Sequence, residues 1–189
     1  PYTTLFRSLD AMKEGATVEA GDGRIEFRGT DPLRGIKAPG EPRLLSAEQS
    51  NASIAFSDRL ILKLYRRLRE GVQPDIEVAR FLTEETDFAA SPALLGTIDW
   101  VEGDGTRTTL AAASEYVGNQ GDAWTYVTEA LERDMERQET AAPEEMPEDP
   151  LMGGGPLDIG AVLGRRTAEM HLALASGGPG TGFSAEELT

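Results

Sequence analysis

The sequence predicts an α+β fold, a mainly antiparallel β-sheet with flanking helices. Short segments that alternate apolar and polar residues are joined by turn-forming residues, which is the pattern of antiparallel strands. Between and after these segments, apolar residues recur at helical spacing. With 189 residues, the chain has the length of one or two domains and can bury a sizeable core.

The amino-terminal part is predicted to be only partly regular. Residues 9–21 open with a possible helical turn that ends at glycines. A strand is predicted over 23–28, where the residues alternate after an Asp-Gly turn. Residues 30–42 are rich in proline and glycine and predict a loop. Residues 1–8 look like the translation of a common sequencing-library adapter, so we expect the true domain to begin near Leu9, with a short native strand as the alternative.

Residues 43–68 contain two predicted strands, joined by a polar turn, and a single lysine. Leu60, Leu62 and Leu64 fall on one face of the second strand by the two-residue period. Lys63 falls on the other face, where an ammonium group among apolar side chains is costly unless an anion meets it. Lys63 therefore indicates a phosphate contact or, alternatively, an edge strand from which the ammonium reaches water.

A helix is predicted over residues 74–86. Pro74 suits the first helical position, and the acids Asp75 and Glu77 favour the positive end of the helix dipole. Protein kinases use the same order, a strand lysine followed by an early helix glutamate, to build the ion pair that orients ATP phosphates. Glu77 is thus a candidate partner of Lys63; the alternative is a solvated acid in the first helical turn.

The second half of the chain predicts a hairpin and two helices. The hairpin comprises residues 93–117 around a Gly-Asp-Gly turn. Helical spacing of apolar residues, among them Trp124, predicts a helix over 122–138 with a buried face. Residues 139–157 form a predicted acidic loop rich in proline and glycine. A second helix is expected over 158–175, and a frayed glycine-rich tail over 176–189.

Five phrases occur in a fixed order along the chain. They are Ala-Glu-Gln-Ser-Asn-Ala-Ser at 47–53, Asp-Arg-Leu-Ile-Leu-Lys-Leu-Tyr-Arg-Arg-Leu at 58–68, Pro-Asp-Ile-Glu-Val-Ala-Arg-Phe-Leu-Thr-Glu at 74–84, Asn-Gln-Gly-Asp-Ala-Trp at 119–124 and Leu-Gly-Arg-Arg-Thr-Ala-Glu-Met-His-Leu-Ala-Leu-Ala at 163–175. Together they resemble bacterial maltokinases, either free-standing or as the kinase part of a trehalose synthase–maltokinase fusion. The resemblance extends from about residue 21 to residue 175 and covers most of the chain.

The resemblance implies a fold of the aminoglycoside phosphotransferase and protein kinase-like superfamily. It also implies transfer of the γ-phosphoryl group of ATP, with Mg²⁺, to the anomeric hydroxyl of maltose, which gives maltose 1-phosphate. The family usually has threonine at the position of Ala52, so any side-chain role there is in doubt. The implied ATP-binding residues are the phosphate loop, the lysine–glutamate pair and the hinge: Gln49, Ser50, Asn51, Ala52, Ser53, Lys63, Glu77, Glu115, Tyr116 and Val117.

The same resemblance divides the chain into segments. Residues 9–42 would be part of an N-terminal cap, and 43–138 the kinase-like N-terminal lobe with its hinge. Residues 139–157 would be an acidic loop, 158–175 a helix that leads into the C-terminal lobe, and 176–189 the tail.

No stretch of the sequence matches the loops that carry catalytic chemistry in this superfamily. His-Gly-Asp, Asp-Phe-Glu and Asp-Phe-Gly motifs do not occur. We therefore assign no catalytic residue and no metal ligand, expect the C-terminal lobe and its magnesium ligands to be absent, and predict that the 189-residue chain alone transfers no phosphoryl group.

The composition argues against several classes of binding partner. The net charge of −15 argues against nucleic acids and anionic membranes, which require basic surfaces. Absence of cysteine fits a reducing compartment, and no apolar run approaches the ~20 residues of a membrane span, so we expect a cytoplasmic protein. The alternative function is a non-catalytic kinase-like scaffold lobe that docks a partner enzyme such as trehalose synthase.

Overall fold

The computed structural model describes residues 2–37, 40–47, 50–140, 159–178 and 181–184. The chain divides into two compact units, which are residues 1–117 with 170–189, and residues 118–169. The predicted acidic loop falls almost wholly outside the described residues. Each unit is considered separately below.

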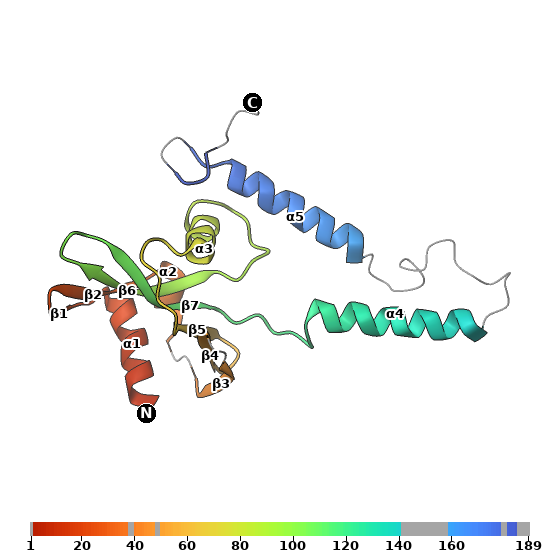
Figure 1. Ribbon diagram of the computed structural model, residues 1–189, viewed down its shortest axis with the longest axis horizontal. Helices are drawn as coiled ribbons and strands as arrows, with labels where there is room; N and C mark the ends of the chain where they lie inside the picture. Colours follow the sequence, from red (N-terminus) through yellow and green to blue (C-terminus); the bar gives the residue numbers. More distant parts are fainter. Residues whose placement is uncertain (1, 38–39, 48–49, 141–158, 179–180, 185–189) are drawn as a thin grey trace. The chain divides into compact units, whose positions relative to one another are not determined.

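The first unit is built on one antiparallel sheet of seven strands in the order β1-β2-β6-β7-β5-β4-β3 (Figure 1). This confirms the predicted α+β class with a mainly antiparallel sheet, and the fold is compatible with a kinase-like lobe. The strands are β1 Thr17–Ala20, β2 Gly23–Gly29, β3 Pro42–Ala47, β4 Asn51–Phe56, β5 Leu60–Tyr65, β6 Leu94–Glu102 and β7 Arg107–Glu115.

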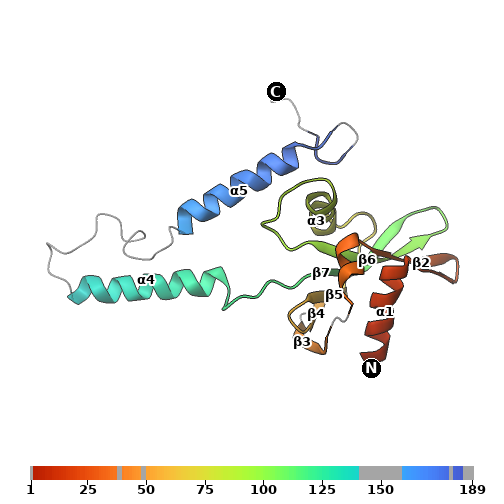
Figure 2. The ribbon, with the colours of Figure 1, turned by 180° about the vertical axis from the view of Figure 1, so that it is seen from behind.

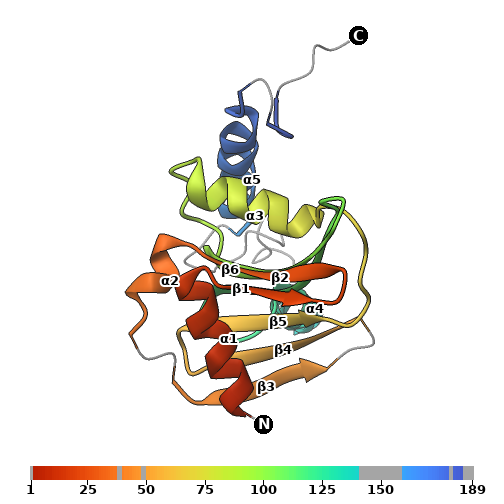
Figure 3. The ribbon, with the colours of Figure 1, turned by 90° about the vertical axis from the view of Figure 1, so that its left-hand side faces the viewer.

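One face of this sheet carries the main hydrophobic core beneath helix α1 (Tyr2–Glu14), which crosses the strands in Figure 3. Leu60 and Leu62 are buried there against Leu9 and Met12, as the two-residue period of β5 predicts. Close approach of α1 depends on the glycine at position 96. A Cβ at Gly96 would meet the Met12 sulfur at 3.0 Å and the Arg28 carbonyl at 2.5 Å.

The opposite face of the sheet is covered by helix α3 (Pro74–Glu84), as Figures 1 and 2 show from two sides. Ile76 packs there with Leu94 and Ala112 in a second, smaller core. Pro74 occupies the start of α3 because proline needs no N–H partner in the first helical turn. The predicted helix over 74–86 is therefore confirmed, ending two residues early.

Several elements were missed or underestimated in the sequence. Residues 43–68 form three strands rather than two, because β3 pairs with β4 through a register shift that obscures its alternation. The predicted loop over 30–42 contains the short helix α2 (Asp31–Gly35), and β1 precedes the predicted strand β2. Helix α1 begins at Tyr2, and the Phe6 ring meets that of Phe56 edge-on at 5.5 Å. The adapter origin of residues 1–8 stays a prediction.

Beyond residue 117, the structure describes two long helices, α4 (Ala123–Thr140) and α5 (Ile159–Ala175). Asp122 caps α4 by accepting a hydrogen bond from the Thr125 N–H at 2.8 Å. The predicted burial of its apolar face is wrong within the described residues, because Trp124 is 79% exposed and Met135 64% exposed. Among the described helices, none is both long enough and apolar enough to cross a lipid bilayer.

The main core should dominate the stability of the first unit. Leu62 is fully buried, so Leu62→Ala leaves a cavity and should lower the free energy of unfolding by about 2–5 kcal/mol. Urea denaturation measures this change. Leu44→Ala, at a strand position that is 61% exposed, is the matched control and should stay within about 0.5 kcal/mol. Equal losses in the two variants would contradict the burial pattern.

Candidate functional site

Lys63 lies on a strand in the interior of the sheet. Its strand, β5, pairs with β4 on one side and with β7 on the other, so the edge-strand alternative is wrong. The Lys63 side chain is 37% exposed and projects from the α3-covered face. Its neighbours across the two strand pairs are Ser53 and Ala112. The small side chains beside it leave the ammonium group open to a ligand on that face.

The anion beside Lys63 is the carboxylate of Asp75. The ammonium nitrogen lies 3.4 Å from Asp75 Oδ2, and the Tyr65 hydroxyl donates a hydrogen bond to the same oxygen at 2.9 Å. The ammonium also lies 5.0 Å from the centroid of the Tyr65 ring. Burial and the Asp75 carboxylate together raise the pKa of Tyr65, which keeps its hydroxyl protonated as a donor.

The predicted partner, Glu77, does not contact Lys63 in this structure. Side chains two residues apart on an α-helix are rotated by about 200° around the helix axis, so Asp75 and Glu77 lie on nearly opposite sides and cannot both face the lysine. Glu77 instead lies in the wall of a cavity described below. The Lys63–Glu77 pair is thus replaced by Lys63–Asp75 here, and a role for Glu77 in ATP binding stays a prediction.

The predicted phosphate loop falls at the β3–β4 turn and the start of β4. Asn51 and Ser53 lie opposite Tyr65 and Lys63, and therefore share the face that carries the lysine. Ala52 lies opposite Leu64 and points to the core face. The Ser50 carbonyl accepts hydrogen bonds from the N–H groups of Arg66 and Arg67 at 2.8 and 3.3 Å. Gln49 lies outside the described residues.

The predicted hinge follows directly after β7. The Glu115 N–H donates to the Ala93 carbonyl at 2.9 Å, and the Tyr116 N–H donates to the Arg59 carbonyl at 3.1 Å. Both N–H groups therefore already donate hydrogen bonds within the protein. Val117 is 52% exposed and is the last residue of the first unit's amino-terminal part. The hinge residues thus sit where the chain leaves the sheet, and adenine binding by them stays a prediction.

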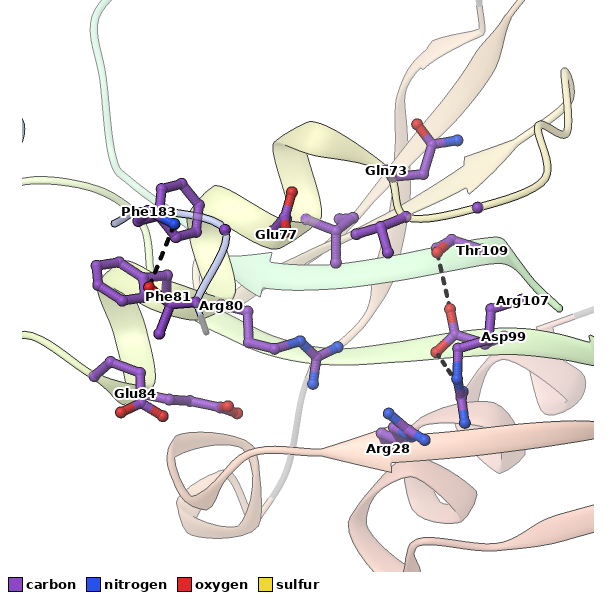
Figure 4. Close-up of a pocket in the computed structure, with 16 residues that line it drawn as sticks. Arg28, Gln73, Glu77, Arg80, Phe81, Glu84, Asp99, Arg107, Thr109 and Phe183 are labelled. Carbon is purple, nitrogen blue, oxygen red and sulfur yellow. Dashed lines mark hydrogen bonds and ion pairs between the residues drawn. The ribbon is translucent and has the colours of Figure 1, made fainter. Parts of the chain in front are cut away.

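A separate cavity of about 470 Å³ lies between α3, the sheet and residues 181–183 (Figure 4). Arginines from β2, α3 and β7 line it, as do acids of α3 and Asp99 of β6. Phe183 closes one end, with its ring centroid 4.5 Å from that of Phe81. The lining residues include Arg28, Glu77, Arg80, Glu84, Glu85, Asp99, Arg107 and Thr109.

A network of charged groups on the sheet supports this cavity. Glu26 accepts hydrogen bonds from Arg24, Arg28 and Arg107 at 2.8, 2.8 and 2.7 Å. The Arg107 hydrogen bond is the main reason that the pKa of Glu26 falls to about 2. Buried Asp99 accepts from the hydroxyls of Thr97 and Thr109 at 2.9 and 2.8 Å.

Sequence reasoning did not single out this cavity. One signal was available, since Asp99 is an acid inside an otherwise apolar strand segment, and a buried acid requires donors. The convergence of arginines from three separate elements had no sequence signature.

The part of the chain that the structure describes contains no group of three or more acidic, histidine or cysteine side chains arranged to hold a metal ion. We therefore assign none of the described residues to a metal ion.

The α+β fold, with its seven-stranded antiparallel sheet, is compatible with a kinase-like lobe. No protein-family model matches the chain. The chain is 27% identical over 168 residues to the glucosamine kinase of Mycolicibacterium smegmatis. The alignment covers 88% of this chain and 37% of that protein, so the chain spans little more than a third of its relative's length. Among solved structures, a glucosamine kinase (crystal form B) matches with a TM-score of 0.47 and 20% identity, over 94% of this chain and 51% of that one.

The lowered pKa of Glu26 makes a specific contribution to stability. Because the folded-state pKa is about 2 and the ordinary value is 4.5, the ionised group stabilises the fold above about pH 4.5. This contribution is lost as the pH falls from 4.5 toward 2. Glu26→Gln removes it, so the gap in unfolding free energy between wild type and variant should narrow over that range. Urea denaturation at a series of pH values measures the gap.

The control for this experiment is Glu102→Gln. Glu102 is exposed at the end of β6 and forms no ion pair within the described ranges. This variant should follow the wild-type pH dependence, whereas a Glu26→Gln profile parallel to that of the wild type would contradict the assignment.

Proposed function

We propose that this chain is the ATP-binding part of a sugar phosphotransferase. The observation that carries the proposal is the position of Lys63. Lys63 projects from the interior strand β5, which pairs with β4, the strand that follows the β3–β4 turn. Helix α3 follows β5 and supplies the acid beside the lysine. Protein kinases arrange a turn, a strand lysine and a helix acid in the same order around the ATP phosphates. Similarity to a glucosamine kinase over most of the chain supports the same class.

In this proposal, Lys63 binds ATP phosphate oxygens as a compact point charge. Its present partner is a weak competitor, because both groups of the Lys63–Asp75 pair are more than a third exposed and the atoms are 3.4 Å apart. Such a pair contributes about 0–1 kcal/mol. A phosphate chain that approaches past Asn51 and Ser53 can therefore displace Asp75 or share the ammonium with it.

Phosphoryl transfer depends mainly on positioning and electrostatic stabilisation, and this chain contributes to both through its lysine. The bound ATP supplies the transferred phosphoryl group, and Mg²⁺ would neutralise its charge. We propose maltose as the acceptor, on the five phrases that resemble maltokinases, and glucosamine as the competing acceptor, on the relative. ADP release from a longer protein that contains this sequence, with each sugar in turn, distinguishes them.

A second candidate function is a kinase-like scaffold that docks a partner enzyme, for which trehalose synthase is our candidate. The exposed apolar side chains of α4, including Trp124 and Met135, favour it. A scaffold does not require nucleotide binding, so a nucleotide test separates the two proposals.

Lys63→Met should weaken ATP binding if the lysine holds the phosphates. The substitution keeps an unbranched side chain of similar length and removes the charge. Titration calorimetry with a non-hydrolysable ATP analogue and Mg²⁺ measures the affinity, and we expect a loss of about tenfold or more. Thermal unfolding of both proteins without nucleotide checks that the variant folds.

Lys37→Met is the matched control, since Lys37 is an exposed lysine in the loop after α2. It should bind the analogue as the wild type does. Equal affinities for wild type, Lys63→Met and Lys37→Met, or no binding by any of them, would favour the scaffold over the kinase.

A further inference from the structure

The cavity between α3 and the sheet has the features of a second ligand site, apart from the surface that Lys63 faces. Its volume of about 470 Å³ is within the usual range for small-molecule pockets. Its floor consists of side chains from β2, β6 and β7. Lys63 does not line it.

The cavity contains a cation whose charge is not neutralised. Arg80 of α3 points from the helix toward the sheet (Figure 4). Its Nη2 donates only to the Thr97 hydroxyl, at 3.4 Å, and among the described residues no carboxylate lies within ion-pair distance of it. A partly buried guanidinium group normally forms paired hydrogen bonds with an anion.

Arg107 lines the same cavity and also has a donor without an acceptor. Its Nη2 is held by Glu26, whereas its Nη1 is buried without a hydrogen-bond acceptor and is 3.9 Å from Asp99 Oδ2. A buried donor without an acceptor costs about 1–3 kcal/mol. An anionic ligand beside Arg80 and Arg107 would supply a counter-charge for Arg80 and a hydrogen-bond acceptor for Arg107.

The other residues that line the cavity indicate which groups the ligand carries besides an anion. Glu77 and Glu84 of α3 line the cavity and have no ion pair in the described parts of the chain. Carboxylates in this position accept hydrogen bonds from hydroxyl groups, and Thr109 adds a hydroxyl. The packed rings of Phe81 and Phe183 form an apolar end of the cavity that suits C–H groups. These acids disfavour the binding of a polyanion such as a triphosphate, since the cavity is lined by more acids than arginines.

We propose that this cavity binds a sugar that carries a single phosphate group. The phosphate would lie at Arg80 and Arg107, and the sugar hydroxyls would face Glu77 and Glu84. The site is separate from the proposed ATP site, with only Glu77 common to the cavity and to the expected ATP-binding residues. The helix that carries Asp75 toward Lys63 also carries Arg80 and Glu77 into the cavity, so an occupied cavity would restrain that helix.

Titration calorimetry with glucose 6-phosphate and glucose 1-phosphate on the 189-residue protein tests the proposal. At least one should bind, while glucose and inorganic phosphate, which each lack one half of the ligand, should bind much more weakly. Arg80→Gln should weaken binding about tenfold or more, because it removes a charged donor and keeps a polar side chain. Arg43→Gln, at an exposed strand arginine, is the control and should bind normally.

Amide NMR spectra locate the bound sugar phosphate without relying on a variant that must fold. Shifts should concentrate at Gly71, Thr109 and Gly182, which border the cavity. Lys63→Met should retain sugar phosphate binding, so loss of the ATP site and loss of this site are distinguishable. Absence of binding, equal binding of inorganic phosphate, or shifts confined to residues around Lys63 would each overturn the proposal.

Discussion

Strand β5 imposes the constraint on which the rest of the first unit depends. Its residues alternate between two environments, so Leu60 and Leu62 enter the core under α1 while Lys63 and Tyr65 face α3. A shift of one residue in register would place the lysine in the core and the leucines under α3. Because burying an unpaired ammonium group costs far more than burying a leucine gains, the register of β5 is fixed, and the lysine is held on the face of the proposed site.

Helix α3 connects the two proposed sites. It covers the sheet through Ile76, presents Asp75 to Lys63 in its first turn and carries Arg80 toward the sheet one turn later. These side chains diverge because each helical residue turns by about 100°. A small movement of α3 would therefore change the Lys63–Asp75 distance and the cavity together. The Phe81–Phe183 contact adds residues near the carboxyl terminus to the elements that hold α3 in place.

Glu26 fixes the positions of charged side chains in the floor of the cavity. Glu26 accepts hydrogen bonds from Arg24, Arg28 and Arg107, which fixes the orientation of two arginines that line the cavity. Asp99 is similarly held by two threonine hydroxyls. Preformed polar groups of this kind lose little entropy when a ligand binds. Arg80 is the exception, since within the described residues only a long hydrogen bond to Thr97 holds it.

The sequence by itself determined those features that depend on neighbours along the chain. Alternation predicted the faces of β5, the Gly-Asp-Gly turn predicted the β6–β7 hairpin, and Pro74 predicted the start of α3. It also singled out Lys63, because a charge among apolar residues of a strand is visible locally. The strands and helices that it missed, β1, β3, α1 in its full length and α2, have weak local patterns and form through pairing or packing with distant residues.

Only the tertiary structure decided which acid meets Lys63 and where the arginines converge. The order of a strand lysine and an early helix glutamate predicted Glu77, whereas the packing of Ile76 on the sheet turned Asp75 toward the lysine. The cavity gathers β2, α3, β6 and β7, which are separated by tens of residues, so no local pattern encodes it. Contacts between distant segments depend on register and helix rotation, and these are fixed only when the apolar faces are buried together.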